Sequence, residues 1–336
     1  MPLYEYVGNL HIHTRYSDGS GSVSQVLRAG RRAGLDFLVV TDHRTLAARP
    51  AQGWHGNLLL LVGEELGEVT GHYLGLGIAE ASQAVDSRAM IAAVTAQGGV
   101  GFIAHPHDPK FPWPDWSAPG FDGLSIWNFT SQWRWSMHAW HHWIVNTLWP
   151  GRVITAPPAE TLAQWDALQG KEGTVPAVGC SDAHAFGWRP LGLPLVILPY
   201  TLLFRAINTH VLLEQPLTGE AAADEKSILR ALRRGSAFIA NGLRGNARGF
   251  RFWAEAGGRT WGMGGSAPAA RGLRLKAALP RPGWMVLLRD GEVVEVARGD
   301  CLCLADPPPG VYRLEVYRDA DRRWGWIFGN PLRVGS

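Results

Sequence analysis

Residues 9–19 read NLHIHTRYSDG and place two histidines one residue apart after a short apolar run. In a strand, residues i and i+2 face the same side, so we expect His11 and His13 to point together into one cavity. Asp18 follows in a Ser-Asp-Gly turn that can fold back towards them. Two imidazoles and a carboxylate suit zinc, manganese or iron better than magnesium or calcium. The alternative is a strand-end pair with one ring hydrogen-bonded and the other in solvent.

The composition is that of a globular protein with a large core. Of the 336 residues, 46% are hydrophobic and only 18% are charged, which argues against disorder. This length suits a barrel plus a small appendage. The formal net charge is +3 and no basic stripe or tail is visible, so we expect no binding of duplex nucleic acid. A small anionic substrate is compatible with this charge.

Neither a disulfide framework nor a membrane segment is expected. The three cysteines, Cys180, Cys301 and Cys303, form no CxxC pair. The first residues, MPLYEY, lack the charged and apolar regions of a secretory signal. The most apolar window, residues 191–204, contains two prolines and is too short to cross a bilayer. We expect a cytoplasmic protein without a membrane partner, and the oligomeric state stays open.

Short apolar runs alternate with helical patterns over the first two thirds of the chain. Strands are expected at residues 7–13, 37–41, 58–62, 71–77, 100–104, 123–127, 175–179 and 237–240. Helices are expected from residue 23 to a stop at Gly34, from 86 to 97, and from 227 to 235. This alternation predicts an α/β fold with a parallel sheet, either open or closed.

Metal-binding residue types collect where these strands end. They come from widely separated parts of the chain: His11, His13, His43, Glu65, His105, Asp182 and His184. Scattered structural histidines would have no reason to do so. In a barrel the functional site lies at the carboxyl ends of the strands, and we therefore expect these side chains to form one site.

Two aromatic insertions interrupt the pattern, at residues 106–120 and 127–149. We expect the second to be an amphipathic aromatic helix packed on the barrel. The alternative is a wall or lid that stacks on a planar substrate, with Trp127 and Trp133 as substrate contacts. The three histidines of this insertion, at positions 138, 141 and 142, are expected to be solvated or packed rather than metal ligands.

The pattern changes after Asn246, where short strand-like runs are separated by glycine and proline turns. This pattern of short strands and turns predicts a small β-sandwich without a ligand cluster. The sequence is therefore divided into a barrel domain at residues 1–245 and a β-sandwich-like domain at residues 246–336.

Seven short motifs together resemble the polymerase and histidinol phosphatase (PHP) superfamily of metal-dependent hydrolases. In chain order they are GNLHIHT (8–14), SDG (17–19), TDH (41–43), GEE (63–65), GH (71–72), AHP (104–106) and SDAH (181–184). The resemblance covers roughly residues 7–245. The stretch GLSIWN (123–128) and the β-rich tail look more specifically like the branch that contains carbaryl-type carbamate hydrolases. The resemblance implies a distorted (β/α)7 barrel that holds two or three divalent ions such as manganese, iron or zinc.

The resemblance also implies which side chains hold the ions. His11, His13, Glu65 and Asp182 would hold the first ion; Glu65, His72 and His105 the second; and Asp18, His43 and His184 the third. Glu65 and Asp182 are therefore catalytic candidates. Glu65 is preferred to Glu64 because the family pattern is Gly-x-Glu and strand alternation turns only one of them inward. A carboxylate at Asp18, where some family members carry histidine, favours manganese or iron over zinc there.

Other residues near the ligands have two interpretations each. Asp42 either orients a metal-bound histidine or belongs to a turn. His107 is either a general acid for the leaving group or a loop residue, and we favour the loop. Arg15, Arg44 and Arg189 lie near ligands in the sequence and can clamp an oxyanion, although each alone is typical of a surface arginine.

Three functions follow from this pattern. Closely spaced ions activate water and take up charge on a phosphoryl or carbonyl oxygen, so the first is a phosphoesterase acting on a small phosphate ester, a nucleotide or an oligonucleotide end. The second is a carboxyl-ester or carbamate hydrolase, motivated by the tryptophan-rich insertion and the branch resemblance. The third is a non-catalytic metal-binding scaffold. The substrate and the ions stay open.

Overall fold

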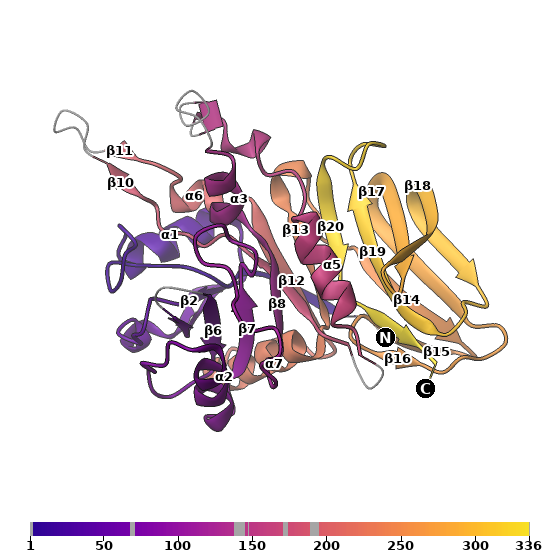
Figure 1. The fold of residues 1–336 in the computed structure, drawn as a ribbon, viewed down its shortest axis with the longest axis horizontal. Helices are drawn as coiled ribbons and strands as arrows, with labels where there is room; N and C mark the ends of the chain where they lie inside the picture. The colour runs from indigo at the N-terminus through magenta and orange to yellow at the C-terminus, as the bar shows by residue number, and fades with distance from the viewer. Residues whose placement is uncertain are drawn as a thin grey trace.

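The computed structural model describes residues 3–67, 71–137, 145–146, 148–170, 174–188 and 195–335. Figure 1 shows a mixed α/β part formed by the first two thirds of the chain and an all-β part formed by the remainder. The two parts lie side by side along the longest axis of the molecule.

The first part contains both strands and helices, but the strands from β2 (Phe37–Val40) to β6 (His72–Leu76) follow one another without an α-helix, so the predicted alternation is only partly correct. The strands are β1 (Tyr4–Asn9), β2 (Phe37–Val40), β3 (Gly53–His55), β4 (Leu58–Val62), β5 (Glu64–Leu66), β6 (His72–Leu76), β7 (Val100–Ala104), β8 (Gly123–Asn128), β9 (Ala177–Cys180), β10 (Gly187–Trp188), β11 (Leu195–Val196), β12 (Ile207–Leu213) and β13 (Ala237–Asn241). The α-helices are α1 (Val23–Ala33), α2 (Ser87–Ala96), α3 (Phe129–Trp135), α5 (Ala159–Ala167), α6 (Tyr200–Leu203) and α7 (Ala221–Arg234). Short 3₁₀ turns are η1 (Arg49–Ala51), η2 (Pro150–Arg152) and η4 (Gly242–Arg244).

Capping residues fix the helix ends where the sequence predicts them. The side chain of Asp86 accepts a hydrogen bond from the amide of Ala89 at the start of α2. Gly34 and Gly235 end α1 and α7 in the left-handed conformation, with φ of 73° and 72°. In the described part of the chain, no helix combines the length and apolarity needed to cross a membrane.

The sheets are mixed, so the prediction of a parallel sheet is only partly correct. The pairs β1–β2, β2–β4, β7–β8 and β8–β9 are parallel, whereas β1–β12, β12–β13, β5–β6 and β6–β7 are antiparallel. Only five residues separate β5 from β6, which is too short for a parallel crossover. Isolated bridges between Ile12 and Ala183 and between His43 and Glu65 join the two large sheets. Closure into a seven-stranded barrel stays a prediction.

The central strand β12 has no counterpart among the predicted strands. It pairs with β1 on one edge and β13 on the other. Polar residues at positions 208–210 interrupt its apolar run, although all three are buried. Thr209 shows how such a residue is accommodated, because its hydroxyl donates to the carbonyl of Gly179 (2.8 Å) and accepts from the amide of Gly179 (3.0 Å).

The C-terminal strands extend the first sheet. They are β14 (Arg251–Ala256), β15 (Arg259–Gly262), β16 (Ser266–Ala267), β17 (Arg274–Arg289), β18 (Glu292–Ala305), β19 (Gly310–Tyr317), β20 (Gly325–Gly329) and β21 (Leu332–Val334). β20 pairs with β13, so the sheet crosses the predicted boundary near residue 246 without interruption. Two of the short strand-like runs after Asn246, at residues 274–278 and 285–288, are parts of one strand, β17. A separate sandwich is not confirmed, and the division into two domains stays a prediction.

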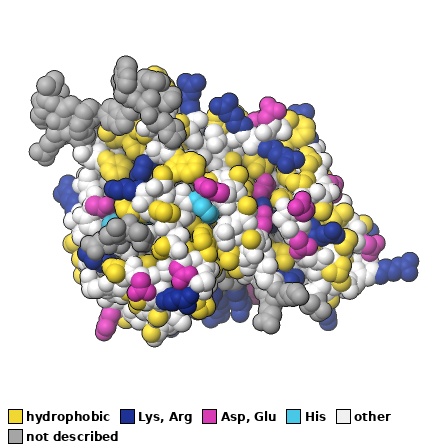
Figure 2. Space-filling model, in the orientation of Figure 1, with side chains coloured by type: hydrophobic (Ala, Val, Ile, Leu, Met, Phe, Trp, Pro, Cys, Tyr) yellow, Lys and Arg dark blue, Asp and Glu magenta, His cyan; other side chains and the backbone are white. Residues whose placement is uncertain are grey.

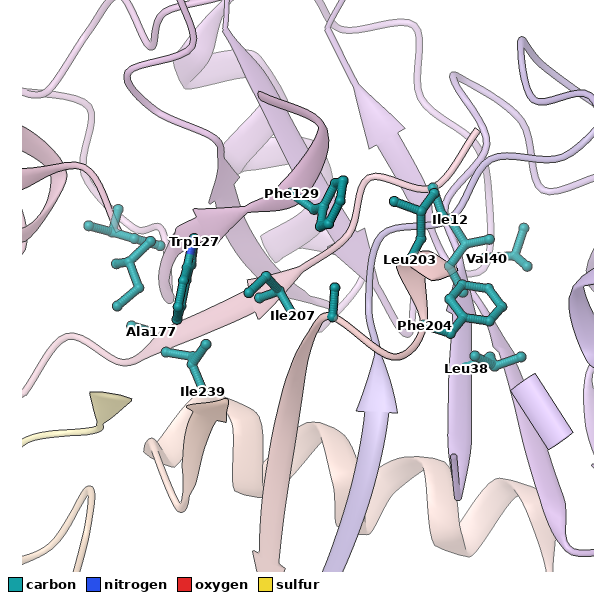
Figure 3. Close-up of a cluster of buried hydrophobic side chains, with 14 of the residues drawn as sticks. Ile12, Leu38, Val40, Trp127, Phe129, Ala177, Leu203, Phe204, Ile207 and Ile239 are labelled. Atoms are coloured by element: carbon teal, nitrogen blue, oxygen red, sulfur yellow. The ribbon is translucent and has the colours of Figure 1, made fainter. Parts of the chain in front are cut away.

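Figure 3 shows the hydrophobic cluster beneath the ligand-bearing segments, with side chains from β2, β8, β12 and β13 converging on one another. Trp127, predicted as a substrate contact, is one of these core residues. It is fully buried, its ring packs edge-on against Phe328, and its indole nitrogen donates to Gln132 (2.9 Å). This position corrects the prediction, because no substrate reaches a ring enclosed in the core.

A buried carboxylate ties the N-terminal strand to the all-β part. Glu5 on β1 accepts hydrogen bonds from His210 on β12 (2.8 Å), from Arg251 on β14 (2.7 Å) and from the amide of Gly249 (2.9 Å). Burial opposes ionisation of this carboxyl, but these donors outweigh it and lower the pKa of Glu5 to about 2.

Replacing Glu5 with glutamine is expected to lower the free energy of unfolding at pH 7 by about 2 kcal/mol, because Arg251 and His210 lose an ionised partner. The wild-type carboxylate stabilises the fold fully above its unfolded pKa and loses this contribution as the pH falls towards 2. Urea denaturation should therefore show a difference between the two proteins that shrinks between pH 5 and about pH 2. The exposed Glu292→Gln variant is the control, and a pH-independent difference would contradict the assignment.

Candidate metal centre

The HxH segment is positioned by main-chain pairing rather than by a strand of its own. β1 ends at Asn9, two residues before the first histidine, instead of continuing to residue 13 as predicted. The amide of His13 donates to the carbonyl of Ala183 (2.9 Å), and the amide of Ala183 donates to the carbonyl of His11 (3.0 Å). Residues 11–13 therefore run parallel to residues 182–184, with Ile12 opposite Ala183.

This pairing sorts the side chains of both segments. Ile12 and Ala183 are fully buried in the hydrophobic core. Because successive side chains point to opposite sides of extended backbone, the flanking residues turn to the other side together: His11, His13, Asp182 and His184. The i, i+2 argument from the sequence thus holds for both segments.

A second bridge brings in the next two ligand positions. His43 follows β2 and pairs with Glu65 on β5. The neighbouring carboxylate of Glu64 points elsewhere and accepts a hydrogen bond from the amide of Ser82 (2.9 Å). Burial raises the pKa of Glu64 to about 7, although Ser82 and Arg44 act in the opposite direction. Glu65 alone of the pair reaches the cluster.

The nine side chains implied by the family resemblance lie in three overlapping groups. Within each group the possible ligand atoms all lie within 4.8 Å of one another. The groups are His11, His13, Glu65 and Asp182; Glu65, His72 and His105; and His13, Asp18, His43 and His184. The implied assignment differs only at His13, which the structure places in the third group as well as the first.

Glu65 divides its two carboxylate oxygens between the first and second groups. Oε2 lies 2.8 Å from Nε2 of His11 and 3.0 Å from Nε2 of His13. Oε1 lies 2.8 Å from Nδ1 of His72 and 3.2 Å from Nε2 of His105. A carboxylate with one oxygen in each of two ligand groups is the arrangement expected of a bridge between two ions.

The ring nitrogens that face Glu65 fit metal coordination better than hydrogen bonding. Nε2 of His11, Nε2 of His13 and Nδ1 of His72 are buried and have no hydrogen-bond partner of suitable geometry within the described structure, despite the short distances to Glu65. Buried polar atoms normally have a hydrogen-bond partner. Three unpaired ring nitrogens that face the same carboxylate therefore indicate a site for a ligand between them. Mixed nitrogen and oxygen donors suit manganese, iron or zinc.

The carboxylates and imidazoles of the first group shift one another's pKa. Burial opposes a charge on His11, but Glu65 and Asp182 raise the pKa of its ring well above the usual range. Burial also opposes a charge on His13, yet the same two carboxylates raise its pKa to about 9. Burial disfavours ionisation of Glu65 and Asp182, while the neighbouring histidines hold both pKa values well below normal. An incoming cation therefore has to displace protons from this group.

The third group is more open than the first two. The Asp18 side chain is 55% exposed, whereas that of Glu65 is 1% exposed. The Asp18 oxygens lie 3.3 Å from Nδ1 of His13, 3.2 Å from Nε2 of His184 and 3.8 Å from Nε2 of His43. Partial burial raises the pKa of Asp18, but the hydrogen bond and charge of His184 outweigh it and lower the pKa well below normal.

Asp42 organises the loop that leads to this third group. Its carboxylate accepts hydrogen bonds from the amide of Thr14 (2.7 Å), the hydroxyl of Thr14 (2.7 Å) and the hydroxyl of Ser17 (2.6 Å). Asp42 is therefore an anchor for the loop between two ligands, His13 and Asp18. None of its hydrogen bonds within the described structure goes to a ligand histidine.

Backbone strain is concentrated at the cluster. Of the eight non-glycine residues with positive φ in the described chain, two are ligand candidates, His105 (28°) and Asp182 (52°). Two more follow ligand candidates directly, namely Arg44 (49°) and Ala185 (49°). Each such residue costs about 1–3 kcal/mol, and such strain is typical of functional sites.

The ligand cluster opens into a cavity of about 440 Å³. Besides seven of the nine ligand candidates, its lining includes residues that the sequence analysis did not single out: Lys110, Phe111, Arg134 and Phe186. The Phe111 ring stacks on His72 with centroids 4.7 Å apart, and the Phe186 ring stacks on His184 at 5.0 Å. Among the predicted substrate arginines, Arg44 also lines the cavity.

The remaining candidates lie elsewhere. His107 bonds to the hydroxyl of Thr161 (3.0 Å), lines a small cavity that it shares with His105, and is absent from the lining of the metal cavity. Its general-acid role stays a prediction. Trp133 packs behind Phe186, with centroids 6.3 Å apart, so its contact with a substrate is at most indirect. Arg15 donates to the carbonyl of Ser20 (2.8 Å) and is absent from the cavity lining. Arg189 and the histidines at 138, 141 and 142 lie outside the described residues.

Comparisons with known proteins give structural similarity alone. No protein-family model matches the sequence, and no curated protein matches it. A two-domain protein from Bacteroides vulgatus that contains a predicted PHP-like metal-dependent phosphoesterase shares 14% identity, with 97% of this chain and 95% of that chain covered and a TM-score of 0.48. An amidohydrolase from Chromobacterium violaceum shares 16% identity over 53% of this chain and 87% of that chain, with a TM-score of 0.33. TM-scores below 0.5 are too low to transfer an activity, so the side chains themselves have to support any function.

Glu65→Gln is expected to reduce the bound metal by at least two equivalents after reconstitution with manganese, because the first and second groups share this carboxylate. His72→Ala should remove the ion of the second group alone. Elemental analysis of tag-free protein measures both. Glu64→Gln is the matched control, since the neighbouring buried carboxylate binds Ser82 instead. Full metal content in Glu65→Gln would contradict the bridging role.

Metal uptake at pH 7 is expected to release about one to two protons, because the raised pKa values of His11 and His13 keep these rings protonated until a cation displaces the protons. Affinity should rise with pH up to about 9, the pKa of His13. Calorimetric titration in buffers with different ionisation enthalpies measures the proton count. Uptake without proton release would contradict protonation of these histidines.

Proposed function

We propose that the protein is a metal-dependent hydrolase, with a small phosphate ester as the favoured substrate. The observation that carries this proposal is the division of the Glu65 oxygens between two ligand groups. When bound, closely spaced divalent ions supply an activated water and neutralise charge that develops on the substrate oxygen. The protein side chains hold these ions and orient the substrate.

The described cavity lining supports attack by water rather than by a side chain. It contains no serine, threonine, cysteine or tyrosine, and the nearby hydroxyls of Thr14 and Ser17 are engaged with Asp42. A covalent intermediate on a hydroxyl or thiol therefore has no support among the described lining residues. Glu65 and Asp182 act by holding ions, with Asp182 kept ionised by His11 and His184.

Positive side chains in the same cavity favour a phosphoryl group. Arg44, Lys110 and Arg134 line it together with the ligand candidates. A phosphate ester carries negative charge in the ground state and gains contacts from such cations, whereas a carbamate is neutral. A nucleotide or an oligonucleotide end fits the same chemistry.

A carbamate or carboxyl-ester hydrolase is the second candidate. The rings of Phe111 and Phe186 stack on two ligand histidines, His72 and His184. These rings give the cavity apolar walls that suit an aryl group. This observation agrees with the resemblance to the carbaryl-hydrolase-like branch, which stays a prediction.

A panel of aryl phosphates and aryl carbamates, assayed with manganese-, iron- and zinc-loaded protein, separates these functions. We expect phosphate release from aryl phosphates, with kcat/KM lowered on the order of 10³-fold in Asp182→Asn because a ligand of the first group is lost. Cleavage of carbamates with phosphates left intact would establish the second candidate. Metal-loaded protein that cleaves neither would leave the non-catalytic scaffold, and metal content must be measured in each sample.

A further inference from the structure

Asp108 is a buried carboxylate that no metal group uses. It lies in the loop after β7 and its side chain is shielded from solvent. Oδ1 accepts hydrogen bonds from the amides of Lys110 (2.8 Å) and Phe111 (3.2 Å). Oδ2 accepts from Nη1 of Arg134 on α3 (2.8 Å). One carboxylate thus joins two segments that are separated by more than twenty residues.

The three residues that Asp108 holds form one wall of the metal cavity, which we call the 110–134 wall: Lys110, Phe111 and Arg134. The Phe111 ring lies nearly parallel to His72, with an interplanar angle of 27°. The Lys110 ammonium lies 4.8 Å and the Arg134 guanidinium 5.9 Å from the centre of that ring. The ring that stacks on His72 therefore also has two cations over it.

One positive charge of the wall is left over. Asp108 neutralises Arg134 through their ion pair. The Lys110 ammonium contacts the Phe111 ring but forms no hydrogen bond or ion pair with a described residue. An anionic group of a ligand would complement this cation, since a cation in a partly closed cavity gains most from a direct ionic partner.

The wall begins where the ligand cluster ends. Phe111 stacks on the ring of His72, a member of the second group, and lines the same cavity. A substrate whose reacting group lies at the cluster would place its next atoms against this ring. The wall thus lies where the leaving group of a substrate would lie.

We propose that Asp108 is a positioning residue that builds the 110–134 wall, and that this wall selects substrates whose leaving group carries its own negative charge. This inference rests on the proposed hydrolase function, because it takes the reacting group to lie at the ligand cluster. Asp108 itself touches neither the reacting group nor the ions.

Two variants separate the parts of this device. In Asp108→Asn one oxygen can still accept from the loop amides, but the amide nitrogen cannot accept from Arg134. Lys110→Gln removes the unpaired cation and keeps the loop contacts, which go to main-chain amides. Asp108→Asn combined with Arg134→Gln breaks the ion pair without changing the net charge of the wall. Asp115→Asn is the matched control, because Asp115 lies in the same loop and binds Ser117 and Arg88 instead.

The test compares phenyl phosphate with 4-carboxyphenyl phosphate as substrates, and phenylphosphonate with 4-carboxyphenylphosphonate as ligands in calorimetry of the metal-loaded protein. We expect wild type and Asp115→Asn to show about tenfold lower KM and Kd for the carboxylated compounds. This preference should fall below about threefold in Lys110→Gln and in the Asp108→Asn, Arg134→Gln double variant, with metal content unchanged.

The possible outcomes distinguish failure of the proposed wall from failure of the proposed hydrolase function. Equal KM and Kd for the two compounds in wild type would overturn the wall and leave the hydrolase standing. Loss of preference in Lys110→Gln but not in the Asp108→Asn, Arg134→Gln double variant would overturn the role of Asp108. A preference in phosphonate binding without hydrolysis of either phosphate would support the wall and overturn the proposed phosphoesterase.

Discussion

The metal centre depends on the main-chain pairing of residues 11–13 with residues 182–184. Two hydrogen bonds fix this register, and the register alone puts Ile12 and Ala183 into the core and their neighbours into the cavity. A slip of one residue would bury the ligands and expose the apolar side chains. The bridge between His43 and Glu65 is a second main-chain pairing that positions two ligand candidates. Both bridges join the two large sheets, so the fold and the site share the same contacts.

Part of the ligand set was predictable from local geometry, because the HxH motif places two side chains on one side of extended backbone. The other ligand positions were implied by the resemblance of the motifs to a known family. The same alternation separates Glu65 from Glu64, and the structure turns Glu64 to Ser82. Helix ends at Gly34 and Gly235 were equally local, since a left-handed residue after a helix favours glycine.

The sequence-based predictions failed where contacts between residues far apart in the chain determine the position of a side chain or strand. Trp127 follows the ligand-rich pattern in sequence, yet a partner 201 residues later, Phe328, encloses it in the core. β12 was missed because its buried polar residues obtain their hydrogen bonds from distant strands, as Thr209 does from Gly179. The role of Arg134 depends on an ion pair to Asp108 across 26 positions, and no sequence spacing indicates such a contact.

The three ligand groups differ in the free energy required to bury their charged side chains. The first two surround Glu65, which is almost fully buried, and uncompensated charges there would be expensive without ions or protons. The third group contains Asp18, which is more than half exposed, and depends on a loop anchored by Asp42 rather than on core packing. Solvent screening weakens its hold on a cation. The two buried groups are therefore expected to hold a cation more firmly than the third group, whose carboxylate is exposed.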